Sequence, residues 1–286
     1  MKVLVTGSNG MLGSNLMKIL PFEVVGFDST ELDITNSNKC ISVLEKEKPN
    51  IIIHTAAHTN VEDCEINHAK AYLVNTIGTQ SLVNYCIDKD ILFIYISSTG
   101  IYGDDKIFEA YNEFDKVNPL TIHHKSKYEA EEIIKNHLSK FLILRTGWLF
   151  GGDITHNKNF VYKRYLEAKS NKLIYSDNSQ IGNPTYIKDL VEQIKVLIYS
   201  KQYGIFNCVN SANNVSRYQY VKRIIELFEL DCQVKVASEN TFKRIAPVSK
   251  NESAQNYKLN LLNLNIMKDW DISLKNYIDN LNYKEN

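Results

Sequence analysis

A glycine-rich segment near the start of the chain constrains the fold more than any other feature. Lys2–Thr6 is a short apolar run typical of a buried strand, and Met11–Leu20 has the spacing of a helix. The glycines that join them recur every three residues, which permits a tight turn and a close approach to a pyrophosphate at the helix N-terminus. We therefore expect a dinucleotide-binding βαβ unit whose contacts come from Gly7, Asn9, Gly10, Met11, Leu12 and Gly13.

Apolar runs of the same kind recur through the first half of the chain. We expect strands at Lys2–Thr6, Glu23–Phe27, Ile51–Thr55, Leu92–Ser97 and Phe141–Arg145, and helices at Met11–Leu20, Asn38–Glu47, Ala69–Cys86 and Ser126–Leu138. Runs that are apolar throughout suit strands buried on both faces, and their alternation with helices is typical of a parallel sheet. The sequence thus predicts an α/β fold with a Rossmann-type, doubly wound parallel sheet.

The pattern loosens after about residue 150. Strands become short, Asn and Lys become common, and helices are expected at Asn159–Ser170, Ile187–Ser200 and Arg217–Leu227. We expect a dinucleotide-binding domain at residues 1–150 and a smaller C-terminal α/β substrate lobe at residues 151–286, interleaved with the first.

The charge balance and the cysteines exclude several classes of function. The chain carries 33 Lys and Arg against 33 Asp and Glu, so no global field attracts nucleic acid or a membrane surface. Five cysteines without ligand-like spacing (Cys40, Cys64, Cys86, Cys208 and Cys232) suit reduced thiols. No apolar stretch reaches membrane-spanning length, and the histidine spacing suggests no metal site. We expect a cytoplasmic protein without a metal.

Asp28 ends the second expected strand, about 20 residues after the glycine turn. A carboxylate at this place can accept hydrogen bonds from the adenosine ribose hydroxyls, and it repels a 2′-phosphate. No Lys or Arg follows closely, which slightly favours NAD(H) over NADP(H). In the alternative interpretation Asp28 caps a turn with Ser29 and Thr30.

Further motifs follow in a characteristic order. They read Leu32-Asp33-Ile34-Thr35, Ala56-Ala57-His58-Thr59-Asn60-Val61, Val74-Asn75-Thr76-Ile77-Gly78-Thr79, Arg145-Thr146-Gly147-Trp148-Leu149-Phe150-Gly151, Pro184-Thr185-Tyr186 and Val209-Asn210-Ser211. With the glycine spacing GxxGxxG, they resemble extended short-chain dehydrogenase/reductases, and within these the dTDP-4-dehydrorhamnose reductase family. The resemblance covers residues 1 to about 220.

This resemblance implies NAD(P)H-dependent reduction of a 4-keto-6-deoxy nucleotide sugar for surface polysaccharide synthesis, and a homodimer is a common arrangement for such enzymes. It implies binding roles for residues that match the motifs. Asp33 and Ile34 would flank the adenine, and Ala56 and Ala57 would line the pyrophosphate and ribose. The residues implied beside the nicotinamide or the sugar are Thr99, Thr146 and Trp148.

Catalysis in the resembled family uses a Ser or Thr, a Tyr and a Lys. The hydroxyl orients the ketone, the Tyr donates a proton, and the Lys acidifies the Tyr and holds the nicotinamide ribose. The matching positions are Ser98, His123 and Lys127, so a histidine stands where the family has its tyrosine. The flanking Pro119-Leu120 and Ser126-Lys127 secure this register.

A histidine at this position changes the expected chemistry. An imidazolium is a stronger acid than a phenol, since their ordinary pKa values are about 6.5 and about 10, but the nearby Lys127 cation disfavours the charged form. Three hypotheses follow: a reductase that uses His123 as its acid and works better at acidic pH, a slow enzyme, or a protein that binds without chemistry. We favour the first.

The C-terminal part departs from the family as well. The family has an Arg-Pro before a segment similar to Ser253–Leu259, whereas this chain has Val248-Ser249. Lys243, Arg244 or Lys250 are candidate replacements as phosphate partners. Two alternatives to a reductase therefore stay open: an epimerase or dehydratase that recycles its NAD, and a non-catalytic dinucleotide-binding regulatory subunit.

Overall fold

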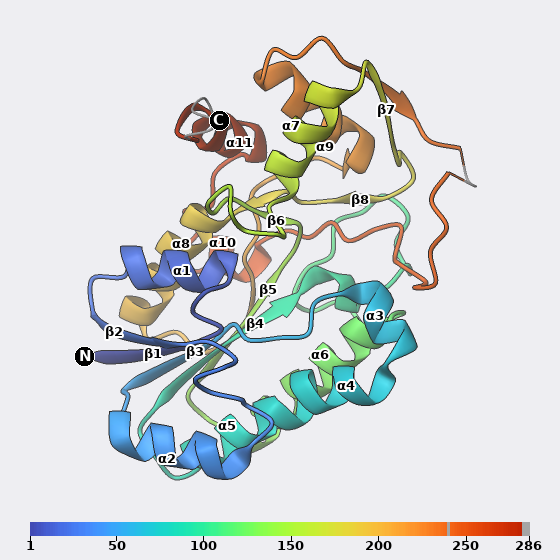
Figure 1. The fold of residues 1–286 in the computed structure, drawn as a ribbon. Helices are drawn as coiled ribbons and strands as arrows, with labels where there is room; N and C mark the ends of the chain where they lie inside the picture. Colours follow the sequence, from blue (N-terminus) through green and yellow to red (C-terminus); the bar gives the residue numbers. More distant parts are fainter. Residues whose placement is uncertain (239–240, 282–286) are drawn as a thin grey trace.

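The computed structural model describes residues 1–238 and 241–281, and its centre is a six-stranded parallel sheet (Figure 1). The strands in spatial order are β10 (Gly204–Asn207), β5 (Phe141–Thr146), β4 (Leu92–Ser98), β3 (Ile51–His54), β1 (Lys2–Thr6) and β2 (Glu23–Phe27). The strand order reverses direction at β1, which pairs with both β2 and β3. Ligands of such sheets bind at this reversal point, and the predicted α/β fold is confirmed.

Helices cover both faces of the sheet, as Figure 1 shows. One face packs against α1 (Met11–Ile19), α8 (Ile187–Ser200) and α10 (Tyr257–Leu261), and the other packs against α2 (Ser37–Glu47), α5 (Gly78–Cys86) and α6 (Ile122–His137). Within β1, Val3 and Val5 belong to the first core and Leu4 to the second. Burial on both faces explains why the strands are apolar throughout.

A smaller lobe stands above the carboxyl ends of the strands (Figure 1). It contains α7 (Phe160–Ser170), α9 (Arg217–Leu227) and α11 (Trp270–Asp279), with the strand pairs β6 (Leu149–Phe150) and β9 (Thr185–Tyr186), β7 (Leu173–Ser176) and β12 (Gln233–Val236), and β8 (Ile181–Gly182) and β11 (Val215–Ser216). Aromatic rings dominate its core. Because β10 pairs with β5 and α8 packs on α1, the sheet domain crosses the boundary expected at residue 150 and the two lobes interleave.

The long helix expected at Ala69–Cys86 is interrupted. After α3 (Val61–Ile66), the chain forms α4 (His68–Tyr72), a π-helical turn η1 (Leu73–Ile77) and then α5. The wider turn rotates the helix faces, so Asn75 is buried while Ile77 is 50% exposed. Asn75 donates to the Ser126 hydroxyl at 2.9 Å, which ties the π-turn to α6.

Helix α6 begins at Ile122, four residues before the predicted start at Ser126. The Thr121 side chain accepts a hydrogen bond from the His124 backbone N–H, which is a regular N-cap. The earlier start places His123 and Lys127 one helical turn apart on the same face.

A buried ion pair anchors α6 to the sheet. The Arg145 guanidinium on β5 donates to both carboxylate oxygens of Glu131, the shortest contact being 2.7 Å, and both side chains are almost fully buried. Ser97 on β4 donates to the same carboxylate at 2.5 Å. Arg145 also donates to the Tyr102 hydroxyl at 3.1 Å. These contacts fix α6 against β4 and β5.

We expect Glu131→Ala to lower the free energy of unfolding by about 3–5 kcal/mol, because it leaves the Arg145 cation buried without its carboxylate. Urea unfolding measures this. Glu132→Ala, at a partly exposed position on the same helix, should cost less than about 1 kcal/mol. The double variant Glu131→Leu with Arg145→Met should be more stable than Glu131→Ala. Equal losses in Glu131→Ala and Glu132→Ala would contradict this role of the pair.

Two features are absent from the described residues, 1–238 and 241–281. No helix there combines the length and the hydropathy needed to cross a membrane. In the same residues no group of three or more His, Cys, Asp or Glu side chains is placed to hold a metal ion. All five cysteines are free thiols.

Candidate active site

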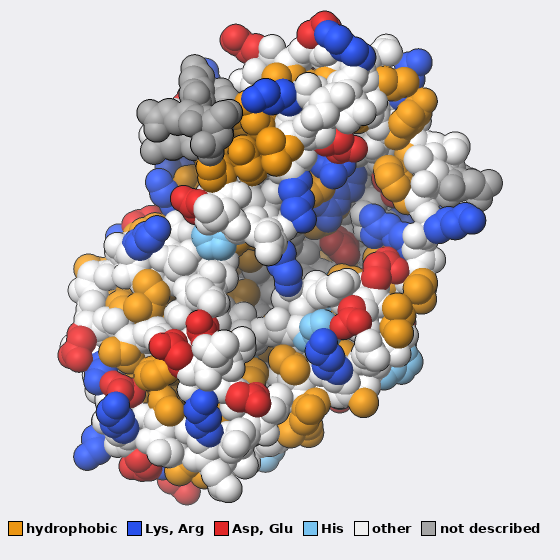
Figure 2. All heavy atoms as spheres, viewed as in Figure 1, with side chains coloured by type: hydrophobic (Ala, Val, Ile, Leu, Met, Phe, Trp, Pro, Cys, Tyr) orange, Lys and Arg blue, Asp and Glu red, His pale blue; other side chains and the backbone are white. Residues whose placement is uncertain are grey.

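A cavity of about 800 Å³ lies at the carboxyl ends of the central strands, below the smaller lobe. Figure 2 shows a hollow between the two lobes, with Lys and Arg side chains gathered around it. The predicted site residues that line the cavity are Gly7, Asn9, Gly10, Met11, Leu12, Gly13, Asp33, Ile34, Ala56, Ala57, Ser98, His123, Lys127, Thr146 and Trp148. The structure therefore brings together every predicted site residue except Asp28 and Thr99.

The glycine loop forms one wall of the cavity. Gly7 has a φ of +68°, and a Cβ at Gly13 would lie 2.2 Å from the Gly7 carbonyl oxygen. Helix α1 starts after Gly10 with no side-chain cap and no acidic residue in its first turn. No side chain therefore accepts hydrogen bonds from the N-terminal N–H groups of α1. These N–H groups and the positive end of the helix dipole suit the binding of a phosphate.

The floor of the cavity joins β1 to β3. The buried His54 ring is hydrogen-bonded to the Thr6 hydroxyl at 2.7 Å and to the Thr79 hydroxyl at 3.1 Å. Burial lowers the pKa of His54 to about 3, so it is a neutral structural group. The Thr55 hydroxyl donates to the Thr6 carbonyl at 2.6 Å. These bonds hold Ala56 opposite the glycine loop.

Asp28 and Thr99 do not line the cavity. The Asp28 carboxylate accepts from the backbone N–H of Thr30 at 2.8 Å and from the Asn9 side chain at 3.0 Å. It thus forms the turn that the alternative interpretation predicts, and its neighbour Ser29 lines the cavity instead. Thr99 is 1% exposed and lies beneath Gly147, where a Cβ would come within 2.5 Å of the threonine hydroxyl.

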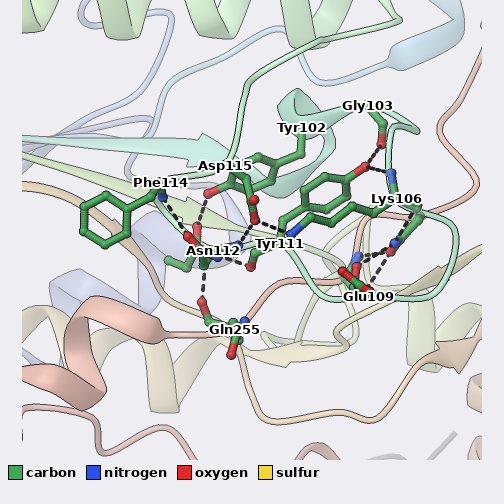
Figure 3. A network of polar contacts seen from close by, with 12 residues as sticks. Tyr102, Gly103, Lys106, Glu109, Tyr111, Asn112, Phe114, Asp115 and Gln255 are labelled. Carbon is green, nitrogen blue, oxygen red and sulfur yellow. Dashed lines mark hydrogen bonds and ion pairs between the residues drawn. The ribbon is translucent and has the colours of Figure 1, made fainter.

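Ser98 ends β4, and the loop after it is held by a polar network (Figure 3). The Tyr111 ring stacks on the Tyr102 ring at 4.9 Å. Its hydroxyl donates to the Gly103 carbonyl and accepts from the Lys106 backbone N–H at 2.9 Å. With this loop fixed, the Ser98 hydroxyl accepts from the Gly100 N–H at 3.2 Å and keeps its own proton to donate.

His123 is buried, and its ring orientation is set by one carbonyl. The His123 Nδ1 lies 3.0 Å from the His58 carbonyl oxygen, which can only accept, so Nδ1 carries a hydrogen. Asn75 holds the His58 peptide on both sides, accepting from its N–H at 2.8 Å and donating to its carbonyl at 3.1 Å. Nε2 is therefore the free ring nitrogen. In the neutral ring it is an acceptor, and it donates only when the ring is protonated.

The environment of His123 favours the neutral ring. Burial, followed by the neighbouring His124 and Lys127, lowers its pKa well below the ordinary value. Burial also lowers the pKa of Lys127 to about 7, against the opposing effect of Glu131. The Lys127 ammonium donates to the Ile96 carbonyl at 2.5 Å and lies over the Tyr95 ring. Both groups therefore titrate at lower pH than they would in water.

Several lining residues were missed by sequence reasoning. Lys70 and Lys158 bring positive charge to the cavity, and Glu252 brings the negative charge of a C-terminal segment. No local pattern could have found Glu252, because it reaches the cavity through tertiary contacts. Its Oε2 accepts from the Trp148 indole N–H at 2.8 Å. Glu252 therefore adds a carboxylate to the wall that Trp148 forms.

Lys243, Arg244 and Lys250 were candidate replacements for the arginine expected near Val248-Ser249. None of the three lines the cavity. Instead, Arg217 of α9 stacks on the Trp148 ring at 3.5 Å. Burial lowers the Arg217 pKa to about 10, partly offset by the Glu252 carboxylate. A guanidinium thus supports the indole from behind.

The cavity fits a nicotinamide dinucleotide. The uncapped α1 N-terminus and the glycine cradle suit its pyrophosphate. The Thr146 hydroxyl is buried against the cavity and has no hydrogen-bond partner among the described residues. A bound polar group would satisfy it.

Comparison with known proteins agrees with this geometry. The RmlD substrate binding domain family matches residues 1–283. The chain belongs to this family.

A dTDP-4-dehydrorhamnose reductase from Aggregatibacter actinomycetemcomitans is 34% identical over 72% of each chain. A spore coat polysaccharide biosynthesis protein, SpsK, from Bacillus subtilis is 32% identical over 79% of this chain and 78% of its own. A solved dTDP-4-dehydrorhamnose reductase from Bacillus anthracis in complex with NADP is 31% identical, with a TM-score of 0.92 over 97% of this chain and 98% of its own.

Two glycine variants separate packing from binding in this family member. Gly13→Ala should lower the free energy of unfolding by about 1–3 kcal/mol, because its Cβ meets the Gly7 carbonyl. Gly10→Ala, whose Cβ lies 3.2 Å from the nearest atom, should change stability by less than about 0.5 kcal/mol. Both should weaken NADH binding about tenfold or more in a fluorescence titration. Unchanged NADH affinity in both variants would contradict the binding of the cofactor at this loop.

Proposed function

We propose that the chain reduces the 4-keto group of a 6-deoxy nucleotide sugar with a nicotinamide dinucleotide, to supply a surface polysaccharide precursor. The observation that carries the proposal is the convergence of Ser98, His123 and Lys127 on a cavity walled by the glycine loop. The names of the relatives support the substrate class. A homodimer and a cytoplasmic location belong to the same proposal as predictions.

The protein groups have distinct tasks in this reaction. Ser98, with its proton free, donates a hydrogen bond to the substrate carbonyl and orients it. Protonated His123 donates a proton from Nε2 to the developing alkoxide, while the His58 carbonyl holds the ring through Nδ1. Lys127 lies one turn from His123 and holds the nicotinamide ribose. The cofactor supplies the hydride.

The pH dependence of reduction follows from the His123 environment. Only the imidazolium carries a proton on Nε2, and its pKa lies well below the ordinary value. Above that pKa the protonated fraction falls about tenfold per pH unit. We therefore expect kcat/KM for reduction to rise as the pH falls from about 8 to about 6.

Two variants test this assignment. His123→Ala should lower kcat by about 100-fold or more. His123→Tyr should flatten the profile, since a tyrosine keeps its proton up to a pKa of about 10 in water. Any slope that persists in His123→Tyr reports Lys127, which also titrates in this range. Identical rates and profiles in wild type and His123→Ala would remove His123 from the mechanism.

A binding-only regulatory protein is the second candidate. The observation that favours it is the low pKa of His123, because few molecules carry the catalytic proton at neutral pH. A silent wild type at every pH, together with an active His123→Tyr variant, would support this candidate. Turnover by the wild type would exclude it.

The cofactor preference depends on two groups near the adenosine end. Asp28 disfavours a 2′-phosphate, but Lys39 folds back to donate to the Thr30 carbonyl at 3.3 Å and brings a cation to the same turn. We propose that the chain accepts both NADH and NADPH.

Lys39→Met should weaken NADPH binding about two- to fivefold and leave NADH binding unchanged, because a single exposed ion pair contributes little. Asp28→Ser should instead improve NADPH relative to NADH. Fluorescence titrations of both coenzymes measure the ratio. Lys46→Met, at another exposed position on α2, is the control. A parallel loss of both coenzymes in Lys39→Met would mean that Lys39 does not contact the 2′-phosphate.

A further inference from the structure

Trp148 has an unusual backbone conformation at the wall of the cavity. Its φ is +42°, in the left-handed region that bulky side chains rarely adopt. The indole packs tightly over Gly182, where a Cβ would lie 2.6 Å from the ring. The Arg217 guanidinium stacks on the ring at 3.5 Å. Such a strained residue persists only when its surroundings hold it, and strain of this kind concentrates at ligand sites.

This arrangement positions the Glu252 carboxylate. The Trp148 indole N–H donates to Oε2 at 2.8 Å. The Glu252 backbone N–H donates to the Ile181 carbonyl at 2.9 Å, and the preceding Lys250 and Asn251 N–H groups both donate to the Asp104 carboxylate. The side chain is only 9% exposed, yet it lines the cavity. Both its backbone and one of its oxygens are therefore fixed.

The remaining oxygen, Oε1, accepts no hydrogen bond from a side chain or backbone group in the described part of the chain. The Glu252 carboxylate interacts with Arg217 and His124 through charge. An ionised carboxylate can only accept hydrogen bonds. In a wall facing the catalytic helix, it suits a ligand group that donates, and it repels one that carries negative charge.

We propose that Glu252 is a specificity-determining residue that accepts a hydrogen bond from a ring hydroxyl of the sugar. The wall selects an uncharged, hydroxyl-bearing sugar and disfavours a sugar acid such as a uronate. Trp148 is the positioning residue that aims the carboxylate. This inference rests on the proposed function for its ligand class, but it concerns sugar binding alone and needs no turnover.

The test compares ligands that differ only in the sugar. Isothermal titration of the full chain with dTDP and with dTDP-glucose, at saturating NADP⁺, gives the two dissociation constants. Glu252→Ala should weaken dTDP-glucose about tenfold, the expected effect of losing one hydrogen bond to a charged group, and should leave dTDP unchanged. The isosteric Glu252→Gln should recover part of the loss, because its amide oxygen still accepts.

Two further variants sharpen the result. Trp148→Phe keeps the carboxylate but removes its indole donor, so the loss should again fall on dTDP-glucose alone. Glu132→Gln, on the outer side of α6, is the matched control and should bind both ligands like the wild type. Thermal unfolding of each variant checks that the fold is kept.

The outcomes separate this inference from the proposed function. Equal weakening of dTDP and dTDP-glucose in Glu252→Ala would overturn the inference, as would unchanged binding of both. The inference would also be overturned if dTDP and dTDP-glucose had the same dissociation constant in the wild type and in every Glu252 variant. Failure of the wild type to bind either ligand would contradict the proposed function and the inference together.

Discussion

One peptide carbonyl links the glycine-loop side of the cavity to helix α6. The His58 carbonyl accepts from the Asn75 side chain and from Nδ1 of His123. His58 follows directly on Ala56 and Ala57, which line the groove, while His123 belongs to α6. The orientation of the His123 ring therefore depends on the same segment that lines the cavity at Ala56 and Ala57. A hydrogen bond between a buried ring and a carbonyl also selects one tautomer, and this determines which chemistry the ring can perform.

The electrostatic surroundings then set the protonation state. His124 and Lys127 each disfavour a charge on His123, in addition to its burial. Glu131, the carboxylate on the same helix, is bound by Arg145 and Ser97 and serves the packing of α6 on the sheet. A tyrosine in this place would stay protonated, because burial raises the pKa of a phenol. The fraction of histidine that carries a proton on Nε2 depends on pH instead. This pH dependence is the physical consequence of the departure from the family pattern.

Features that depend on a short stretch of sequence, such as the limits of the strands, were predicted correctly. Each strand of the first half ends within one residue of its predicted limits, because burial on both faces makes such strands apolar throughout. Other features depend on contacts between distant segments. The π-turn at Asn75 breaks the helical period, the early start of α6 needs the Thr121 cap, and β10 joins the sheet from the far side of the predicted boundary.

The candidate site shows the same division. The glycine loop, Ala56, Ser98 and Thr146 line the cavity because they lie at or just after the carboxyl ends of parallel strands. Asp28 was predicted from its position, and its carboxylate also accepts from the Thr30 N–H. Thr99 is adjacent to Ser98, yet it begins the 3-10 turn Thr99–Tyr102 and lies beneath Gly147. Glu252 could not be foreseen, because only the folded C-terminal segment brings it to Trp148.

The most direct test of the account is to follow the hydride itself. Wild-type protein is mixed with dTDP-4-dehydrorhamnose and NADPH deuterated at the transferable position of the nicotinamide, at a mildly acidic pH, and the sugar is examined by NMR. We expect one deuterium at C4 of the product for each NADPH consumed. Bound coenzyme without deuterium transfer at any pH would contradict it, and the chain would then be a binding protein.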